Sequence, residues 1–371
     1  MMILFFYHSL LAVSYYLYAL SNPSDSVGYF GRVLALRRGE DWLDYFGVST
    51  IFIEFVNYPL VHGLGFTYES SMVFFSWLGF LGFLFFYLFF LDNTHVRPKI
   101  FGFNGIMLLL LLPNLHFWSS SLGKGSLIFF GFGLFFFGLS RPAIRFWALI
   151  VGGWIIFQIR PHIFYVVLIA LGLGYTFSTR GVAIGYRLAI LVAALFLLNY
   201  IYADVVKLTG LEDESLLDPL ISSRAQELTK ATSGIDITSY SLPEKLFAFW
   251  FRPLFVDAPG FLGLIVSIEN LFYLLFFVRL LHPQALLYLW NADALVKTSL
   301  MTFLGVSIAL AQITGNLGLA IRQKSQVMIL MLFVILRFLD EQKISQLRGQ
   351  LRRKTRQGMT MNRDSKGLKP V

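Results

Sequence analysis

The side chains best suited to chemistry in this sequence are cations that interrupt long apolar stretches. They are Lys124, Arg160, Arg252 and Arg322. Guanidinium groups bind phosphate oxygens through paired hydrogen bonds, and cations can stabilise a departing diphosphate without a metal. If the apolar stretches are membrane spans threaded in an even number, these four residues lie at external ends of the spans. The pattern therefore predicts a diphosphate-binding site at one surface of a membrane.

Each of these cations also has a structural interpretation. Arg160, which precedes a proline, could end one helix and start the next while its side chain reaches lipid headgroups. Arg252 could stack on neighbouring aromatic rings, and Arg322 could be an ordinary interfacial anchor. Lys124 lies between two glycines, which permit close backbone approach, so it is less typical of a core residue.

Three residues are candidates for a general base: Asp25, His116 and His162. Imidazole titrates near neutrality and can remove a proton from an attacking hydroxyl group. Asp25 is an acid of the first predicted external loop, where Asp41 and Asp44 are alternatives. Because a histidine at a membrane interface is more commonly a satisfied structural residue, the sequence leaves the choice of base open.

Glu269 and Asn270 lie well inside a predicted span. An ionisable side chain in the hydrocarbon region is costly unless it is paired or protonated, so we hypothesise an intramembrane function for this pair. The alternative is a structural pairing with a neighbouring helix.

Several chemistries lose support because their motifs are absent. The chain has no Cys, no HExxH, no phosphate-binding Gly loop and no GxSxG. The lack of Cys excludes disulfides, thiolate metal sites and a cysteine nucleophile. The other absences argue against soluble-type hydrolases and nucleotide-driven chemistry. We predict no metal and no cofactor.

The composition is that of a membrane protein. Of 371 residues, 57% are hydrophobic, 14% are charged and 40 are Phe, whereas soluble domains are about one quarter charged. Backbone that crosses a bilayer must be helical or form a closed barrel, and the long continuous apolar stretches favour helices. We therefore predict an all-α polytopic membrane protein.

We expect about ten transmembrane helices, some of them broken or re-entrant. The apolar stretches are 1–20, 70–91, 101–139 with a break at 113–126, 146–158, 163–177, 188–202, 247–252, 261–280, 300–313 and 327–339. The first lacks the positively charged start of a secretory signal, so we expect it to be retained. Residues 241–244 have capping-box spacing, which predicts that a helix begins there.

These stretches form one predicted membrane domain, residues 1–339, with external loops at about 21–66 and 204–246. Ten spans place both termini in the cytoplasm. The basic residues near Arg97, Arg141, Arg180 and Arg279 then fall on the same side as the tail, as the positive-inside rule requires.

Residues 340–371 are predicted to form a basic cytoplasmic tail. The net charge is +9, and nine Lys or Arg with a single acid lie between residues 342 and 371. Such a segment favours contact with anionic headgroups over nucleic acid, for which we predict no role. Ile344, Leu347 and Leu351 recur at helical spacing, which indicates a short interfacial helix, with a simply solvated tail as the alternative.

The chain resembles the EpsG-like and Wzy-like polysaccharide polymerases of bacterial envelopes, which are related in layout to lipid-donor (GT-C type) glycosyltransferases. The resemblance is diffuse and spans most of the chain. Its strongest parts are 113–126, Arg160-Pro161-His162, the block from Phe251-Arg252-Pro253 to Glu269-Asn270, and 316–323. The family's closely spaced Asp and Tyr of the first loop are approximated by Asp25 with Tyr29, or by Asp44 with Tyr45.

The resemblance implies a multi-pass protein of the bacterial cytoplasmic (inner) membrane that polymerises lipid-diphosphate-linked repeat units into an O-antigen or exopolysaccharide outside the cytoplasm. Its implied partners are a polyprenyl-diphosphate-linked glycan, membrane lipids and envelope polysaccharide export proteins. It makes Arg160, Arg252 and Arg322 diphosphate contacts and Asp25 or a histidine the base. One alternative function is a transporter or flippase for a lipid-linked or anionic solute. Another is a non-catalytic membrane subunit of an envelope complex.

Overall fold

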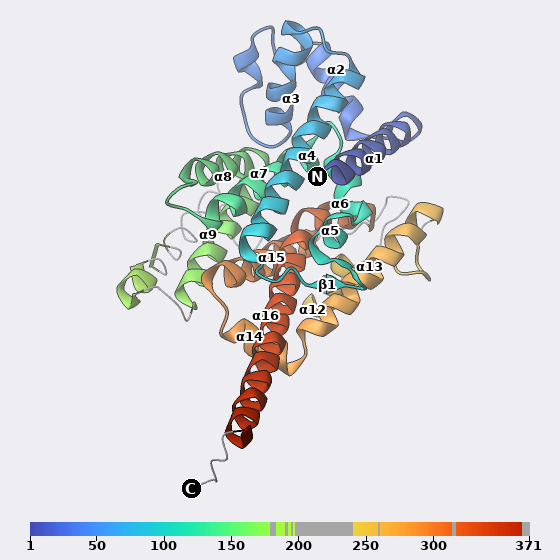
Figure 1. Ribbon diagram of the computed structural model, residues 1–371. Coiled ribbons are helices and arrows are strands. Elements are labelled where there is room, and N and C mark those ends of the chain that lie inside the picture. The colour runs from blue at the N-terminus through green and yellow to red at the C-terminus, as the bar shows by residue number, and fades with distance from the viewer. Residues whose placement is uncertain are drawn as a thin grey trace.

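The protein is described by a computed structural model that covers residues 1–178, 183–189, 192–193, 196, 240–258, 260–313 and 317–365. In these residues the chain is almost entirely helical, and one two-stranded antiparallel hairpin pairs Lys99 with Asn104 and Ile100 with Phe103. The predicted all-α class is therefore confirmed (Figure 1).

The elements follow one another with short connections. The first half contains α1 (Met2–Ser21), α2 (Asp25–Leu34), the 3-10 turn η1 (Trp42–Tyr45), α3 (Thr50–Tyr58), the π-helical turn η2 (Pro59–Gly63), α4 (Tyr68–Asn93), β1 (Lys99–Ile100), β2 (Phe103–Asn104), α5 (Gly105–Leu110), α6 (Pro113–Ser119), α7 (Lys124–Ser140), α8 (Phe146–Ile159) and α9 (Pro161–Thr176). The second half contains α12 (Leu242–Phe251), α13 (Gly260–Leu280), α14 (Pro283–Trp290), α15 (Ala294–Ile313) and α16 (Leu317–Ser365).

Five described helices are long and apolar enough to cross a membrane: α1, α4, α13, α15 and α16. A sixth crossing results if α6 and α7, which meet at a bend of 114°, count as one broken span. The break expected within 101–139 is thus confirmed, but the count of about ten is not. The helices α8 and α9 are apolar but shorter, and the expected span 188–202 falls mostly outside the described residues.

The core is built from phenylalanine rings on neighbouring helices. α4 packs on α7, and α7 packs on α8. Phe83 and Phe86 of α4 both contact Phe129 of α7, while Phe89 contacts Phe136 of α7 and Phe333 of α16. Because aromatic rings bury a large area each, these contacts fix the three helices against one another.

The predicted first external loop is a small folded unit of α2, η1, α3 and η2 (Figure 1). The carboxylate of Glu54, fully buried in α3, accepts hydrogen bonds from Arg32 at 2.6 Å and Arg38 at 2.5 Å. A buried carboxylate needs such partners, so this pairing holds the segment in a defined fold.

Basic residues gather at the opposite end of the molecule. Arg141 and Arg145 both bond Asp92 at the end of α4, and Arg337 donates to the carbonyl of Asn93. Arg279 reaches Gln342 at the start of the tail. The segments predicted to share a side therefore share one end of the structure, although Arg180 lies outside the described residues.

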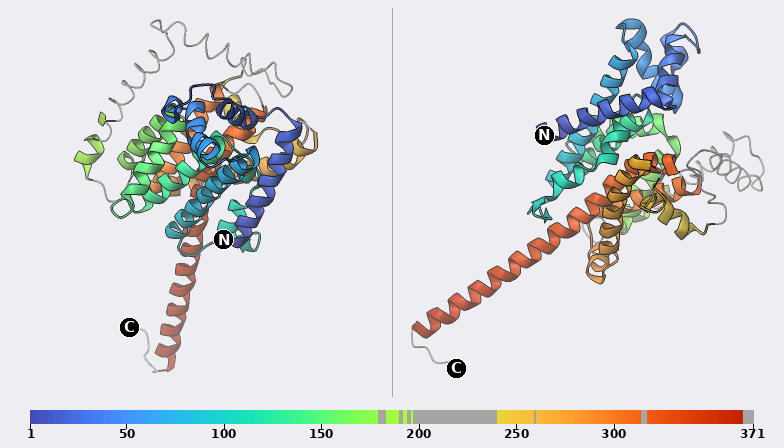
Figure 2. Two further views of the ribbon diagram at one scale, coloured as in Figure 1. Left: turned by 90° about the horizontal axis from the view of Figure 1, so that it is seen from above. Right: turned by 90° about the vertical axis from the view of Figure 1, so that its right-hand side faces the viewer.

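The last predicted span and the tail form one helix. α16 is 49 residues long and continues from the core into the basic segment, which extends away from the body of the protein (Figure 2). The tail is thus neither a separate interfacial helix nor an irregular chain up to Ser365. The helix start predicted at 241–244 is confirmed, because Ser241 and Glu244 form a capping box at the start of α12. The remainder of the second predicted loop, up to residue 239, lies outside the described residues.

Close packing of α4 on the bend between α6 and α7 leads to a stability prediction. A Cβ atom at Gly79 would lie 1.8 Å from the carbonyl oxygen of Ser119, whereas a Cβ atom at Gly31 in α2 would meet nothing within 4 Å. We expect Gly79→Ala to lower the free energy of unfolding by about 1–3 kcal/mol, since backbone must move to make room. Gly31→Ala is the matched control and should not destabilise the protein. Unfolding by SDS titration in mixed micelles measures both, and equal values would contradict the packing described here.

Candidate functional site

An ion pair joins the start of α2 to the last helix. The Nη1 of Arg322 donates to the Oδ2 of Asp25 at 2.5 Å, across 297 positions of the sequence. The guanidinium of Arg322 also lies over the ring of Trp118 on α6, at 5.9 Å from the centroid. Asp25 is the more exposed partner, at 56%, compared with 21% for Arg322. The carboxylate thus lies nearer the surface of the protein than the guanidinium.

Tyr29 and Arg160 lie beside this ion pair. Burial, followed by the charge of Asp25, raises the pKa of Tyr29, while the nearby Arg322 and Thr50 act in the opposite direction. Arg160, between α8 and α9, is close enough to Arg322 and Tyr29 to interact electrostatically with both. Burial and then the positive charge of Arg322 lower the pKa of Arg160 to about 10. The Nε of Arg160 is buried and has no hydrogen-bond partner among the described residues.

Lys124 approaches the same place from the start of α7. Its Nζ donates to the Oγ of Ser49 at 2.7 Å, and the backbone N of Ser49 bonds to the carbonyl of Gln158 at 2.6 Å, two residues before Arg160. A Cβ atom on Gly123 would lie 3.3 Å from the Tyr29 ring. Lys124, Arg160 and Arg322, together with Asp25 and Tyr29, are called the cation cluster below.

Arg252 is the predicted diphosphate contact that the structure does not bring into this cluster. Its guanidinium forms an ion pair with Asp257 and lies 3.4 Å from the hydroxyl of Tyr240. The side chain therefore serves the turn that follows α12, and among the described residues its hydrogen-bond partners are Asp257 and Tyr240, not Lys124, Arg160 or Arg322. The backbone carbonyl of Arg252 accepts a hydrogen bond from Lys324, two residues beyond Arg322.

The two histidines proposed as bases lie in different surroundings. His162 is exposed in the first turn of α9, two residues after Arg160. His116 is fully buried in α6, where its Nδ1 lies 3.0 Å from the Nδ1 of His8 and its ring stacks on Phe83. The prediction that His116 is displayed at an external end is wrong, because α6 turns this side chain into the core.

Glu269 and Asn270 belong to a buried polar network. Glu269 accepts hydrogen bonds from the backbone N of Asn114 at 2.7 Å and from the hydroxyl of Tyr273. Asn270 accepts from Lys324 at 2.7 Å and donates to the carbonyl of Pro253 at 2.7 Å. The network connects α6, α13, α16 and the end of α12, as the alternative interpretation of a structural pairing required.

Lys324 is the central residue that sequence reasoning missed. It is fully buried, and its ammonium donates to Asn270, to the carbonyl of Arg252 at 2.9 Å and to that of Trp250 at 3.3 Å. Its position in the sequence could have indicated this role, because Lys324 is a charged residue between two apolar parts of one helix. Such a residue requires partners inside the protein.

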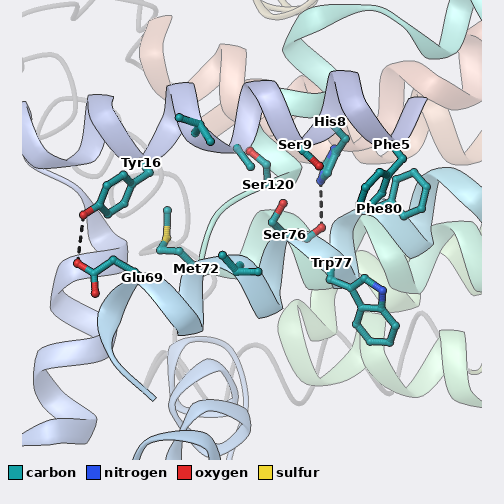
Figure 3. Close-up of a pocket in the computed structure, with 13 residues that line it drawn as sticks. Phe5, His8, Ser9, Tyr16, Glu69, Met72, Ser76, Trp77, Phe80 and Ser120 are labelled. Atoms are coloured by element: carbon teal, nitrogen blue, oxygen red, sulfur yellow. Dashed lines mark hydrogen bonds between the residues drawn. The ribbon is translucent and has the colours of Figure 1, made fainter. Parts of the chain in front are cut away.

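A groove of about 360 Å³ lies between α1 and α4 (Figure 3). At one end the hydroxyl of Tyr16 donates to Glu69 at 3.1 Å. Towards the other end the Nε2 of His8 lies 3.0 Å from the carbonyl of Ser76. The rest of the lining is largely apolar, and Val13, Val73 and Trp77 are exposed on it. The groove is thus open along its apolar side.

Comparison with known proteins does not assign the chain to a family: no family model, curated protein or solved structure matches it.

The Lys324 network leads to a stability prediction. Lys324→Met keeps the length of the side chain but leaves three buried oxygen atoms without their donor, so we expect a loss of at least about 2 kcal/mol in the free energy of unfolding. Lys343→Met, on the exposed part of the same helix, is the matched control and should change little. SDS titration gives both values. A Lys324→Met protein as stable as the control would show that these hydrogen bonds do not hold the helices.

Proposed function

We propose that this protein is a membrane glycosyltransferase that polymerises lipid-diphosphate-linked oligosaccharide repeat units, and that the cation cluster binds the diphosphate. The observation that carries the proposal is the convergence of Lys124, Arg160 and Arg322 from three distant parts of the chain around Tyr29. The resemblance of these segments to envelope polysaccharide polymerases supplies the reaction.

The electrostatics of the cluster favour an anionic ligand. Arg160 and Arg322 are close enough for each charge to oppose the other, and the Asp25 carboxylate bonds Arg322. The buried Nε of Arg160 is a donor without a partner among the described residues. Like charges held together in a partly dehydrated site are stabilised by an anion between them, and a diphosphate offers several oxygens to two guanidinium groups.

In the proposed reaction, the hydroxyl oxygen of the acceptor repeat unit attacks the anomeric carbon of the growing glycan. The bond between that carbon and the diphosphate oxygen breaks, and the lipid diphosphate leaves with the electron pair. Arg160 and Arg322 stabilise the developing negative charge. Asp25, which is more than half exposed at the mouth of the cluster, accepts the proton of the attacking hydroxyl. The step requires no metal.

The proposal includes an orientation. The cation cluster and the α2–η2 unit face the extracytoplasmic side of the bacterial inner membrane, and the basic end with the tail faces the cytoplasm, in accord with the positive-inside rule. Both termini then lie inside. The shorter helices α8, α9 and α12 and the expected span 188–202 supply the four further crossings that, with the five long helices and the bent α6–α7 pair, make ten. Polysaccharide export proteins receive the product.

Reconstitution with lipid-linked repeat units tests the activity. We expect elongation by the intact protein, and a loss of about tenfold or more in turnover for Arg160→Lys, because the ammonium keeps the charge but not the two-pronged hydrogen bonding. Arg141→Lys, at the basic end, is the matched control and should retain turnover. Substrate movement across the vesicle membrane without elongation would instead identify a transporter. If the protein shows neither elongation nor substrate movement, the remaining interpretation is a non-catalytic subunit.

Replacement of the proposed base tests its assignment. Asp25→Asn keeps a hydrogen-bonding side chain next to Arg322 but removes the proton acceptor, so we expect turnover to fall by about 10²–10⁴-fold. Retention of a lipid diphosphate on the variant, measured by co-purification from labelled vesicles, would separate loss of the base from loss of the site. His162→Gln and Asp44→Asn are compared in parallel. If one of these abolishes elongation while Asp25→Asn does not, that residue replaces Asp25 in the mechanism.

A further inference from the structure

Two buried histidines from helices far apart in sequence contact each other inside the helical body. The Nδ1 atoms of His8 on α1 and His116 on α6 are 3.0 Å apart. The remaining ring nitrogens point at carbonyl oxygens: the Nε2 of His8 lies 3.0 Å from the oxygen of Ser76, and the Nε2 of His116 lies 2.7 Å from that of Leu110. All four ring nitrogens are therefore within hydrogen-bonding distance of a partner.

The contacts fix the number of protons on the pair. A carbonyl oxygen only accepts hydrogen bonds, so both Nε2 atoms must carry a hydrogen. The contact between the two Nδ1 atoms requires one more hydrogen, because two lone pairs at 3.0 Å repel each other. Three N–H groups are thus needed, whereas two neutral imidazoles provide two. We propose that His8 and His116 form a binding site for one proton, shared between their Nδ1 atoms, which gives the pair a single positive charge.

Burial disfavours a charge on the pair, and the surrounding groups offset part of that cost. The His116 ring lies parallel to that of Phe83, with centroids 3.8 Å apart and an angle of 4°, and an imidazolium is attracted to the negative face of such a ring. Tyr7 of α1 contacts the edge of His116, and α4 and α5 contribute the Ser76 and Leu110 oxygens. A buried charge with these neighbours is partly compensated.

Other titratable groups near the pair belong to the buried polar network of Glu269 and Lys324. Glu269 of α13 interacts with Tyr7, and it bonds the backbone of Asn114, two residues before His116. Glu269 is also bonded to Tyr273 and lies near the ammonium of Lys324 on α16. Glu269 thus interacts with Lys324 and with Tyr7, and Tyr7 in turn contacts the ring of His116.

The shared proton links three helices. It holds α1 on α6, while the Nε2 of His8 holds α1 on α4. His8 also lines the groove between α1 and α4, so protons can reach the pair from that side (Figure 3). Loss of the proton would leave two acceptors facing each other and would weaken the contact between α1 and α6. The inference stands independently of the proposed enzymatic activity.

Nitrogen NMR of the histidine-labelled protein in lipid bilayers tests the proposal. The other four histidines, His62, His95, His162 and His282, are exposed, so His8 and His116 are the two buried histidines of the six. We expect one histidine of the six to retain both ring hydrogens at pH 8, with a scalar coupling between the two Nδ1 atoms across the hydrogen bond. This measurement uses the unmodified protein, so it does not depend on whether a variant folds.

Two variants assign the signal. His8→Gln should remove the doubly protonated signal at pH 8, and His162→Gln, which changes an exposed histidine, should leave it in place. Six neutral histidines at pH 8, or a doubly protonated signal that persists in both His8→Gln and His116→Gln proteins, would overturn the proposal.

Discussion

The three hydrogen bonds of the Lys324 ammonium determine how the last helix meets the rest of the protein. An ammonium in an apolar bundle must find its acceptors within the protein, because neither lipid nor a dry core supplies them. Lys324 finds them on α13 and at the carboxyl end of α12, which fixes both the height and the rotation of α16. Since Arg322 is two residues away on the same helix, its approach to Asp25 depends on this buried arrangement.

The positions of the cations could be inferred from the sequence because each interrupts an apolar stretch. A charged residue at such a break lies at the end of a helix, and in the structure Arg160 and Arg322 lie beside Tyr29 while Lys124 bonds Ser49. The same reasoning placed Arg141, Arg279 and the tail together at the other end. End-to-end placement follows from the order of apolar and polar segments alone, which is why it was predictable.

The order of apolar and polar segments does not determine how a helix is rotated about its own axis. His116 was expected at the surface and is buried, and His8 drew no attention within an apolar stretch, yet the two rings meet. Arg252 likewise follows α12 as expected, but a local acid, Asp257, captures its side chain. The folding of the 21–66 segment around Glu54 was missed because composition does not say which acid pairs with which base. The count of about ten spans is not confirmed, because α8 and α9 are shorter than the five long helices and the stretch 188–202 lies mostly outside the described residues.

The unbroken length of α16 has a mechanical consequence. With 49 residues and a rise of about 1.5 Å each, the helix is a rod of roughly 70 Å that carries Arg322 near one tip and the basic segment at the other. A hydrogen-bonded helix resists compression along its axis far more than it resists sideways bending. A force applied along the axis at the basic end of α16 is therefore transmitted along the helix to Arg322. The two ends of the protein are thus mechanically coupled through α16.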